Sequence, residues 1–286
     1  MKLIKASFEV FPQHESSLNG IYKSIETAGR NCYKSEDKIT DRSCIEFVGR
    51  MVKSGHGAML EHGTIYLKVE ITSPLHDMDY FRKMELVSRY SKNKYSKVIT
   101  DRKTGYGVIY YITSNYRVIT ENEWDVDLQY LCEPEDKHEK RVMVRIITDN
   151  GVLREFTRHR VFSFAVESTR YCNYSKGKFN NEVTYIIPPW VPTEDVRTAD
   201  VKWDEVTFIK ALTDAEKSYF ELLELGWKPQ QARNVLPLGT KCDIIMTGFV
   251  SDWKHFFELR TPESAHPQVR EIAIPLQEEF KRLKYV

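Results

Sequence analysis

The segment TRHRVFSFAVESTRYCN, residues 157–173, concentrates charged and hydroxyl side chains within a short stretch. Its polar residues are Arg158, His159, Arg160, Ser163, Glu167, Ser168, Thr169, Arg170 and Tyr171. The apolar residues Phe162, Phe164, Ala165 and Val166 between them are expected to anchor the segment in a core. Guanidinium groups at this density suit a flat, anionic ligand that carries phosphate and carbonyl oxygens, because each fork donates two hydrogen bonds.

The triplet Arg158–Arg160 is predicted to contact more than one partner. If residues 151–160 continue as one helix, successive side chains project about 100° apart, so Arg158 and Arg160 point in divergent directions. Arg154 and Arg158, four residues apart, would share a face. The triplet should then touch two different ligands, or one ligand and another subunit. The alternative is a solvated basic helix end, where the helix dipole favours cations.

Several segments of the chain resemble the flavin-dependent thymidylate synthase family. The spacing of Arg158-His159-Arg160, seven residues and then Ser168 is similar to that family's motif. Similar segments occur in the family's order from about residue 20 to 280, with only the middle poorly covered. They are Arg30–Tyr33, Ser54–His62, Glu167–Tyr171, Ala232–Pro237, Leu259–Arg260 and Ser264–His266.

The resemblance implies reductive methylation of dUMP to dTMP. It implies FAD as cofactor, NADPH as reductant and 5,10-methylenetetrahydrofolate as carbon donor. It also implies a homotetramer with active sites at subunit interfaces, in agreement with the divergent directions of the triplet. The other known route to thymidylate uses a cysteine that follows a proline. None of the five cysteines, Cys32, Cys44, Cys132, Cys172 and Cys242, does so, and they are expected to be inert thiols.

The resemblance also assigns site residues, position by position. The implied FAD-binding residues are His56, Glu61, Arg158, His159, Arg160 and His255. The implied dUMP-binding residues are Glu155, Arg158, Glu167, Ser168, Thr169, Arg170, Arg233 and Arg260. Arg260 is expected to be catalytic, because a fixed cation at the pyrimidine N3 edge stabilises the charge that develops there. Ser168 is expected to bind substrate and not to attack it, since a serine nucleophile needs an adjacent base.

Three residues depart from the family pattern. Glu155 stands where compact members carry a glutamine, and its carboxylate would repel phosphate unless Arg154 or Arg170 neutralises it. Phe249 and Ser251 stand where asparagine and arginine are expected beside the flavin. These departures favour an alternative function, a flavin-dependent pyrimidine nucleotide hydroxymethylase. A nucleic-acid-binding protein is a further alternative, because lysines and tyrosines interleave between residues 90 and 106, although the favoured interpretation of that stretch is a solvated, tyrosine-rich surface.

The periodicity and the resemblance together predict an α+β fold with a mixed central sheet flanked by long helices. The chain is interpreted as a single catalytic domain, residues 1–286, with an insertion at approximately 75–137. Within the insertion we expect a helix over 77–90 and a hairpin of strands 108–113 and 116–120 across Ser114 and Asn115. Outside it we expect strands at 3–11, 64–71, 142–147, 183–187 and 241–250. A helix capped by Ser16 or Ser17 is expected to end near Tyr33, and a second one capped by Asp41 near Gly55. Further helices are expected to cover 204–225, 252–259 and 267–283.

The composition excludes some classes of protein. The formal charge is +1, with 42 basic and 41 acidic residues, so no overall field attracts a nucleic-acid polymer or a membrane. An odd number of cysteines without paired spacing is typical of a reducing compartment, and the chain shows neither a long apolar run nor a signal-peptide pattern. We therefore expect a cytoplasmic protein that binds small molecules. No metal is expected, because no further ligands follow His56, Glu61 and His62 at a metal-site spacing.

Overall fold

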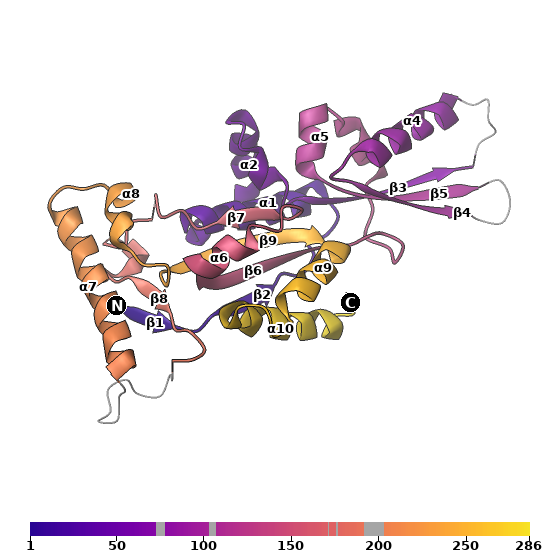
Figure 1. Cartoon of the computed structure of the whole chain (residues 1–286). Coiled ribbons are helices and arrows are strands. Elements are labelled where there is room, and N and C mark those ends of the chain that lie inside the picture. Colours follow the sequence, from indigo (N-terminus) through magenta and orange to yellow (C-terminus); the bar gives the residue numbers. More distant parts are fainter. Residues whose placement is uncertain (73–77, 103–106, 171, 176, 192–202) are drawn as a thin grey trace.

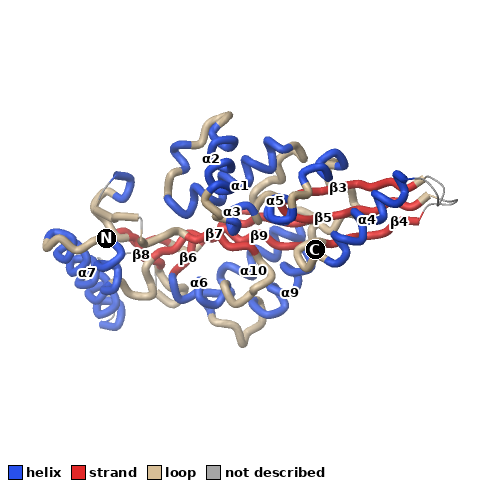
Figure 2. Tube along the Cα trace, turned by 90° about the horizontal axis from the view of Figure 1, so that it is seen from above, coloured by secondary structure: helices blue, strands red, loops and turns tan. Residues whose placement is uncertain are grey.

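The computed structural model describes residues 1–72, 78–102, 107–170, 172–175, 177–191 and 203–286. The molecule is elongated, with a central sheet in its middle and smaller groups of elements at its two ends (Figures 1 and 2). Tyr171, Lys103 and Tyr106, which the sequence analysis used, lie outside the described residues. In the part of the chain that is described, no helix combines the length and apolar character that crossing a membrane requires.

The central sheet has the strand order β2 (Ser7–Val10), β6 (Arg141–Asp149), β9 (Lys241–Phe249) and β7 (Ser163–Val166). Each neighbouring pair in it is antiparallel, so the prediction of a mixed central sheet is wrong, although the α+β class is confirmed. Strands β6 and β7 run in the same direction, but β9 lies between them and is antiparallel to both, so they do not pair with each other. The register of β6 with β9 runs from Arg141 opposite Phe249 to Asp149 opposite Lys241.

Helices cover both faces of the central sheet (Figure 1). One face packs against α9 (Val250–Arg260) and α10 (Pro267–Arg282), where Val144 and Ile146 meet Trp253 and Phe256 in one buried cluster. The other face packs against α1 (Leu18–Tyr33) and the short α3 (Gly57–Leu60), and α2 (Ser43–Lys53) packs on these two helices. Because both faces are buried, the centre of β9 carries three consecutive apolar residues, Ile244, Ile245 and Met246, which are all buried.

Capping side chains set two of the helix starts that matter for the site. Ser17 accepts a hydrogen bond from the Gly20 amide at the start of α1, as predicted. Asp149 accepts from the Val152 amide at the start of α6 (Asn150–Phe156). The predicted cap of α2 is wrong: Arg42 holds the N-cap position, and the amide of Thr40 donates to the Ser43 hydroxyl.

A three-stranded sheet extends beyond one end of the central sheet, in the order β3 (Thr64–Ile71), β5 (Val108–Asn115) and β4 (Lys97–Arg102). Two helices pack with it, α4 (Met78–Lys92) and α5 (Tyr116–Asn122). The predicted hairpin across Ser114 and Asn115 is wrong. Asn115 ends β5, and its side chain accepts from the Val118 amide, so the chain turns into a helix there. Strand β5 pairs with β3 and β4 instead.

The opposite end of the molecule carries the longest helix of the described residues, α7 (Trp203–Glu224). Beside it lie α8 (Pro229–Ala232) and the parallel pair β1 (Lys2–Ile4) and β8 (Thr184–Ile186). The strand predicted at 3–11 is therefore divided into β1 and β2, which belong to different sheets. Gly226 closes α7 with φ of 89°, a left-handed conformation that suits glycine.

Candidate functional site

The triplet lies in the turn that leads from α6 to β7. Helix α6 ends at Phe156, so Arg158, His159 and Arg160 do not continue it. His159 is buried, with 8% of its surface exposed, whereas the two flanking arginines are exposed. The His159 ring packs against Phe256 at a centroid distance of 5.0 Å. The histidine therefore anchors the turn, and the two arginines remain exposed on either side of it.

Arg260, at the end of α9, connects the triplet to α6. Its Nε donates to His159 Nε2 at 2.9 Å, and its Nη1 donates to Glu155 Oε2 at 2.8 Å. Its Nη2 donates to the Glu155 carbonyl at 3.0 Å. Arg260 thus supplies the neutralising charge for Glu155 that the sequence analysis sought from Arg154 or Arg170. The side chain of Arg260 keeps 15% exposure, so one edge of this group faces solvent.

His159 is a neutral imidazole in this arrangement. Burial, and to a lesser extent the positive charge of Arg260, lower its pKa to about 4. A neutral ring can accept the hydrogen bond from Arg260 at Nε2, which a protonated ring cannot. His159 therefore orients Arg260 at any pH near neutrality.

Two of the residues implied for dUMP binding meet at a cavity of about 200 Å³. Arg233 Nη1 donates to Thr169 Oγ1 at 2.9 Å, across 64 positions of sequence, and Arg154 and Asn150 line the same cavity. Ser168 lies next to Thr169, and its amide donates to the Cys32 carbonyl at 2.9 Å. Arg170 is exposed. The structure thus brings Thr169 and Arg233 together from separate motifs.

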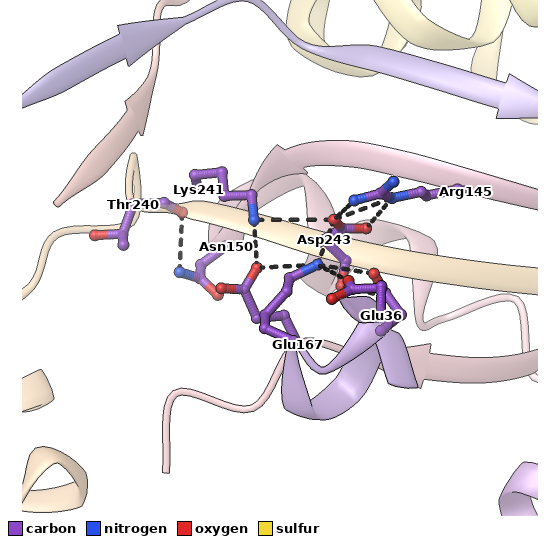
Figure 3. Close-up of polar contacts among 9 residues, drawn as sticks. Glu36, Arg145, Asn150, Glu167, Thr240, Lys241 and Asp243 are labelled. Carbon is purple, nitrogen blue, oxygen red and sulfur yellow. Dashed lines mark hydrogen bonds and ion pairs between the residues drawn. The ribbon is translucent and has the colours of Figure 1, made fainter. Parts of the chain in front are cut away.

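Glu167 lies in a buried network of charges behind this segment (Figure 3). Its carboxylate is 2.6 Å from Lys241 Nζ and 4.0 Å from Lys34 Nζ. Asp243 is fully buried in the same network and pairs with Arg145 and Lys34, each at 2.5 Å. Burial alone would raise the pKa of Asp243, but its bonds with Arg145 and Lys34 outweigh burial and lower it. Glu167 is therefore held by protein cations, and its contact with dUMP stays a prediction.

A larger cavity, of about 540 Å³, lies beside Arg160. Arg160 and Glu61 line it, and both were implied for FAD binding. Glu61 Oε1 also accepts from Arg117 Nη1 at 2.6 Å. Of the other residues implied for FAD, His56 and His255 are exposed, and His255 Nδ1 lies 3.3 Å from Glu258 Oε2. Within the described residues, the lining of this cavity includes neither of these histidines, nor Arg158 or His159.

Residues 140–283 match the model of the family described as thymidylate synthase complementing protein, and this segment covers half of the chain. The chain belongs to this family. The matched segment contains the triplet, Ser168, Arg233 and Arg260. It does not contain His56, Glu61 or the three-stranded sheet.

Curated relatives carry the name flavin-dependent thymidylate synthase. The protein from Pyrococcus abyssi is 32% identical over 128 residues, which are 45% of this chain and 49% of that protein. The protein from Haloarcula marismortui is 31% identical over 134 residues, 42% of this chain and 54% of that protein. The chain thus spans about half the length of the curated relatives it matches.

Among solved structures, the chain is similar to a UMP/dUMP methylase from Streptomyces cacaoi bound with 5-Br dUMP. The TM-score is 0.45 and the sequence identity is 17%, with 99% of this chain and 93% of that chain covered. A similarity this loose does not establish a common fold.

The residues around the larger cavity fit a flavin. Its volume falls in the range of about 300–1,000 Å³ typical of ligand pockets. Arg141, at the start of β6, is 7% exposed and lines the cavity beside the ring of Phe249. Burial lowers the pKa of Arg141 to about 10, which still leaves it charged at neutral pH. A buried cation next to an aromatic ring suits a ligand with phosphates and a planar ring system.

The sequence analysis missed Arg141, Lys94 and Lys97, which line this cavity. The signal for Arg141 was a charged residue directly before the apolar residues Val142, Met143 and Val144 of the strand. The lysines gave no such signal, because they were interpreted as part of a solvated surface. The structure agrees with the interpretation of the cysteines as inert: none of the five is joined in a disulfide within the described residues, and burial raises the pKa of Cys32 to about 11. Among the described residues, no group of His, Cys, Asp and Glu side chains could hold a metal.

Proposed function

We propose that this chain is a flavin-dependent thymidylate synthase that converts dUMP to dTMP with 5,10-methylenetetrahydrofolate, FAD and NADPH. The observation that carries the proposal is the family match over residues 140–283, which includes the triplet, Ser168, Arg233 and Arg260. The names of the curated relatives support it. The geometry supports it as well, because Arg160 lines the larger cavity, and Thr169 and Arg233 line the smaller one.

In this proposal the 540 Å³ cavity receives part of FAD at Arg160 and Glu61. The proposed FAD-binding set also includes Arg158, His159, His56 and His255, which lie outside the lining of that cavity. The 200 Å³ cavity, lined by Thr169 and Arg233, is the proposed binding site of dUMP. There the dUMP-binding set is Glu155, Arg158, Glu167, Ser168, Thr169, Arg170, Arg233 and Arg260. FAD supplies hydride transfer to the pyrimidine ring when it is bound.

Arg260 acts in this proposal as the catalytic residue of the chain. Its guanidinium, which stays charged at any working pH, stabilises the negative charge that develops at the N3 edge of the pyrimidine. His159 fixes the orientation of that guanidinium by accepting from its Nε. Glu155 holds Nη1 in the absence of substrate, so the pyrimidine and the Glu155 carboxylate compete for the same donor. Ser168 binds the nucleotide and does not attack it.

The oligomeric state and the location are part of the proposal. A homotetramer with active sites at subunit interfaces agrees with exposed arginines on both sides of His159, because a second subunit could approach one of them. A cytoplasmic location agrees with an odd number of cysteines without paired spacing.

A pyrimidine nucleotide hydroxymethylase is the second candidate, and Phe249 is the observation that favours it. The apolar ring of Phe249 lines the larger cavity and is 8% exposed. An apolar residue at a flavin contact can change the fate of the transferred carbon. The two candidates share flavin and nucleotide and differ in whether the product carries a methyl or a hydroxymethyl group.

The test is to purify the protein, record its absorption spectrum and supply dUMP, methylenetetrahydrofolate and NADPH. We expect a flavin spectrum, with or without added FAD, and a product with the mass of dTMP. A product heavier by one oxygen would select the hydroxymethylase. A protein that cannot be reconstituted with flavin, or that shows no turnover of any pyrimidine nucleotide, would refute both.

A further inference from the structure

Two lysines of the three-stranded sheet region reach the wall of the 540 Å³ cavity. Lys94 and Lys97 belong to residues 93–97, the segment that follows α4 and ends with the first residue of β4; we call it the region before β4. Most of the other cavity residues belong to the central sheet and its connections. Lys97 Nζ donates to Ser251 Oγ at 2.9 Å, across 154 positions of sequence. The same Nζ lies 5.0 Å from the ring centroid of Phe249. The region before β4 is thus in direct contact with the end of β9 and the start of α9.

The cavity carries an excess of positive charge. The basic residues of its lining are Lys94, Lys97, Arg141 and Arg160, and the acidic ones are Glu61 and Asp252. The two carboxylates already have partners. Glu61 accepts from Arg117, and Asp252 Oδ2 accepts from the Phe249 amide at 3.1 Å. The basic side chains therefore outnumber the carboxylates that could balance them.

The hydrogen bonds of Arg141 do not neutralise its positive charge. Its Nη1 donates to the Glu61 carbonyl at 2.9 Å, and its Nη2 donates to Ser163 Oγ at 3.2 Å. Both acceptors are neutral, and so is the Ser251 hydroxyl, which accepts the hydrogen bond from Lys97 Nζ. Burying a cation against neutral acceptors is costly, and an anion that enters the cavity would offset that cost. Lys97 Nζ and the Arg141 guanidinium carbon lie over the ring of Phe249, 5.0 Å and 5.6 Å from its centroid, so both cations meet at this wall of the cavity.

We propose that Lys94 and Lys97, together with Arg141, bind the phosphate groups of a dinucleotide in this cavity. The inference rests on the proposed function, in which FAD is the dinucleotide; NADPH carries the same phosphate chemistry and is the other source. Lys97 exchanges its neutral Ser251 partner for a phosphate oxygen, and Lys94 turns from the Tyr95 ring, 4.9 Å away, toward the same group. The region before β4 is then part of the cofactor site.

The test compares binding of FAD and riboflavin to the apoprotein by flavin fluorescence. The variants are Lys94→Gln, Lys97→Gln and the double substitution, with Lys92→Gln as matched control. Lys92 is exposed at the end of α4 and does not line the cavity. A charge-assisted bond to phosphate is worth roughly tenfold or more in affinity. We expect the double variant to raise the Kd for FAD at least tenfold and to weaken its dependence on salt. Riboflavin has no phosphate, so its Kd should be unchanged.

The outcomes separate this inference from the proposed function. If Lys92→Gln and the wild type bind FAD equally and the double variant binds it weakly, the inference holds. If FAD affinity is unchanged in the double variant but the Kd for NADPH rises at least tenfold, the phosphates are those of NADPH. Unchanged affinity for both dinucleotides would overturn the inference and leave the proposed function standing. A wild-type protein that binds no flavin would overturn both. Matching thermal unfolding of all variants excludes misfolding as the cause.

Discussion

Two groups of charged side chains lie toward opposite ends of the β6–β9 ladder and differ in how their charges are balanced. Toward one end, the fully buried Asp243 pairs with Arg145 and Lys34, and Lys241 pairs with Glu167 (Figure 3). At the other end, the guanidinium of Arg141 donates to neutral oxygen atoms beside a cavity. Cations bound to carboxylates hold the fold together, whereas a buried cation bound to neutral acceptors is available to an anionic ligand.

Residues that the sequence predicted to be ligand-binding also divide between the two groups. Glu167 belongs to the paired group, while Arg160 and Glu61 lie at the cavity. Arg260 shares features of both groups. It pairs with Glu155 as a structural cation does, but it keeps an exposed edge and a neutral histidine beside it. Three predictions test this division, beginning with the largest expected effect.

Asp243→Asn should destabilise the fold severely. The substitution keeps the shape of the side chain but removes the charge that balances Arg145 and Lys34, so the free energy of unfolding should fall by about 3–5 kcal/mol. Denaturant unfolding at neutral pH measures it. Asp214→Asn is the control, because the pair of Asp214 with Lys210 is exposed on both sides and its loss should produce no measurable change. A loss in Asp243→Asn as small as in the control would show that the buried network does not hold the fold together.

Arg260→Ala should reduce turnover of dUMP about a hundredfold or more, as loss of one charge-stabilising donor does. Arg260→Lys should restore little, because a point charge cannot replace a planar fork. The measurement is anaerobic reoxidation of reduced flavin after addition of dUMP and methylenetetrahydrofolate. A second readout is the pKa of His159 by NMR, which should rise in Arg260→Ala because the charge of Arg260 helps to lower it. Reoxidation at the wild-type rate in Arg260→Ala would remove Arg260 from catalysis.

Acidification should destabilise the wild type more than His159→Gln. The pKa of His159 is about 4 in the folded protein against 6.5 for an ordinary histidine, so below pH 6.5 the unfolded chain takes up a proton that the folded protein does not. The contribution of the neutral His159 to the free energy of unfolding is therefore fully present above pH 6.5 and is lost as the pH falls toward 4. Between pH 7 and pH 5 the loss from His159 should be about 2 kcal/mol.

The measurement is the free energy of unfolding of both proteins at the two pH values. His62 is buried and also has its pKa lowered, to about 3, so it adds a loss of the same sign. Because His62 is present in the wild type and in the variant, its contribution cancels in the difference between them. Equal losses on acidification in the two proteins would show that His159 is not held neutral by the packed core.

Local patterns in the sequence were enough for many elements. Alternation of apolar and polar residues predicted the strand at 64–71 with the bounds of β3, and Ser17 predicted the start of α1. The order of motifs predicted the family, and half of the chain matches its model. These features depend on periodicity, capping and residue order, which are properties of short segments. Asn115 shows where this reasoning fails, since one asparagine can be read as a hairpin turn or as a helix cap.

Tertiary structure alone decided which charges meet. Arg260 neutralises Glu155 across 105 positions, Lys34 reaches Asp243 across 209, and Lys97 reaches Ser251 across 154. Sequence patterns report which residues are buried or exposed in their own segment, but they do not report which distant segment packs against them. The sequence therefore identified arginines and carboxylates suited to a nucleotide and a flavin. The packing of β6 against β9 and of the region before β4 against α9 determined which of them are neutralised and which face a cavity, because an ion pair depends on distance in space and not on separation along the chain.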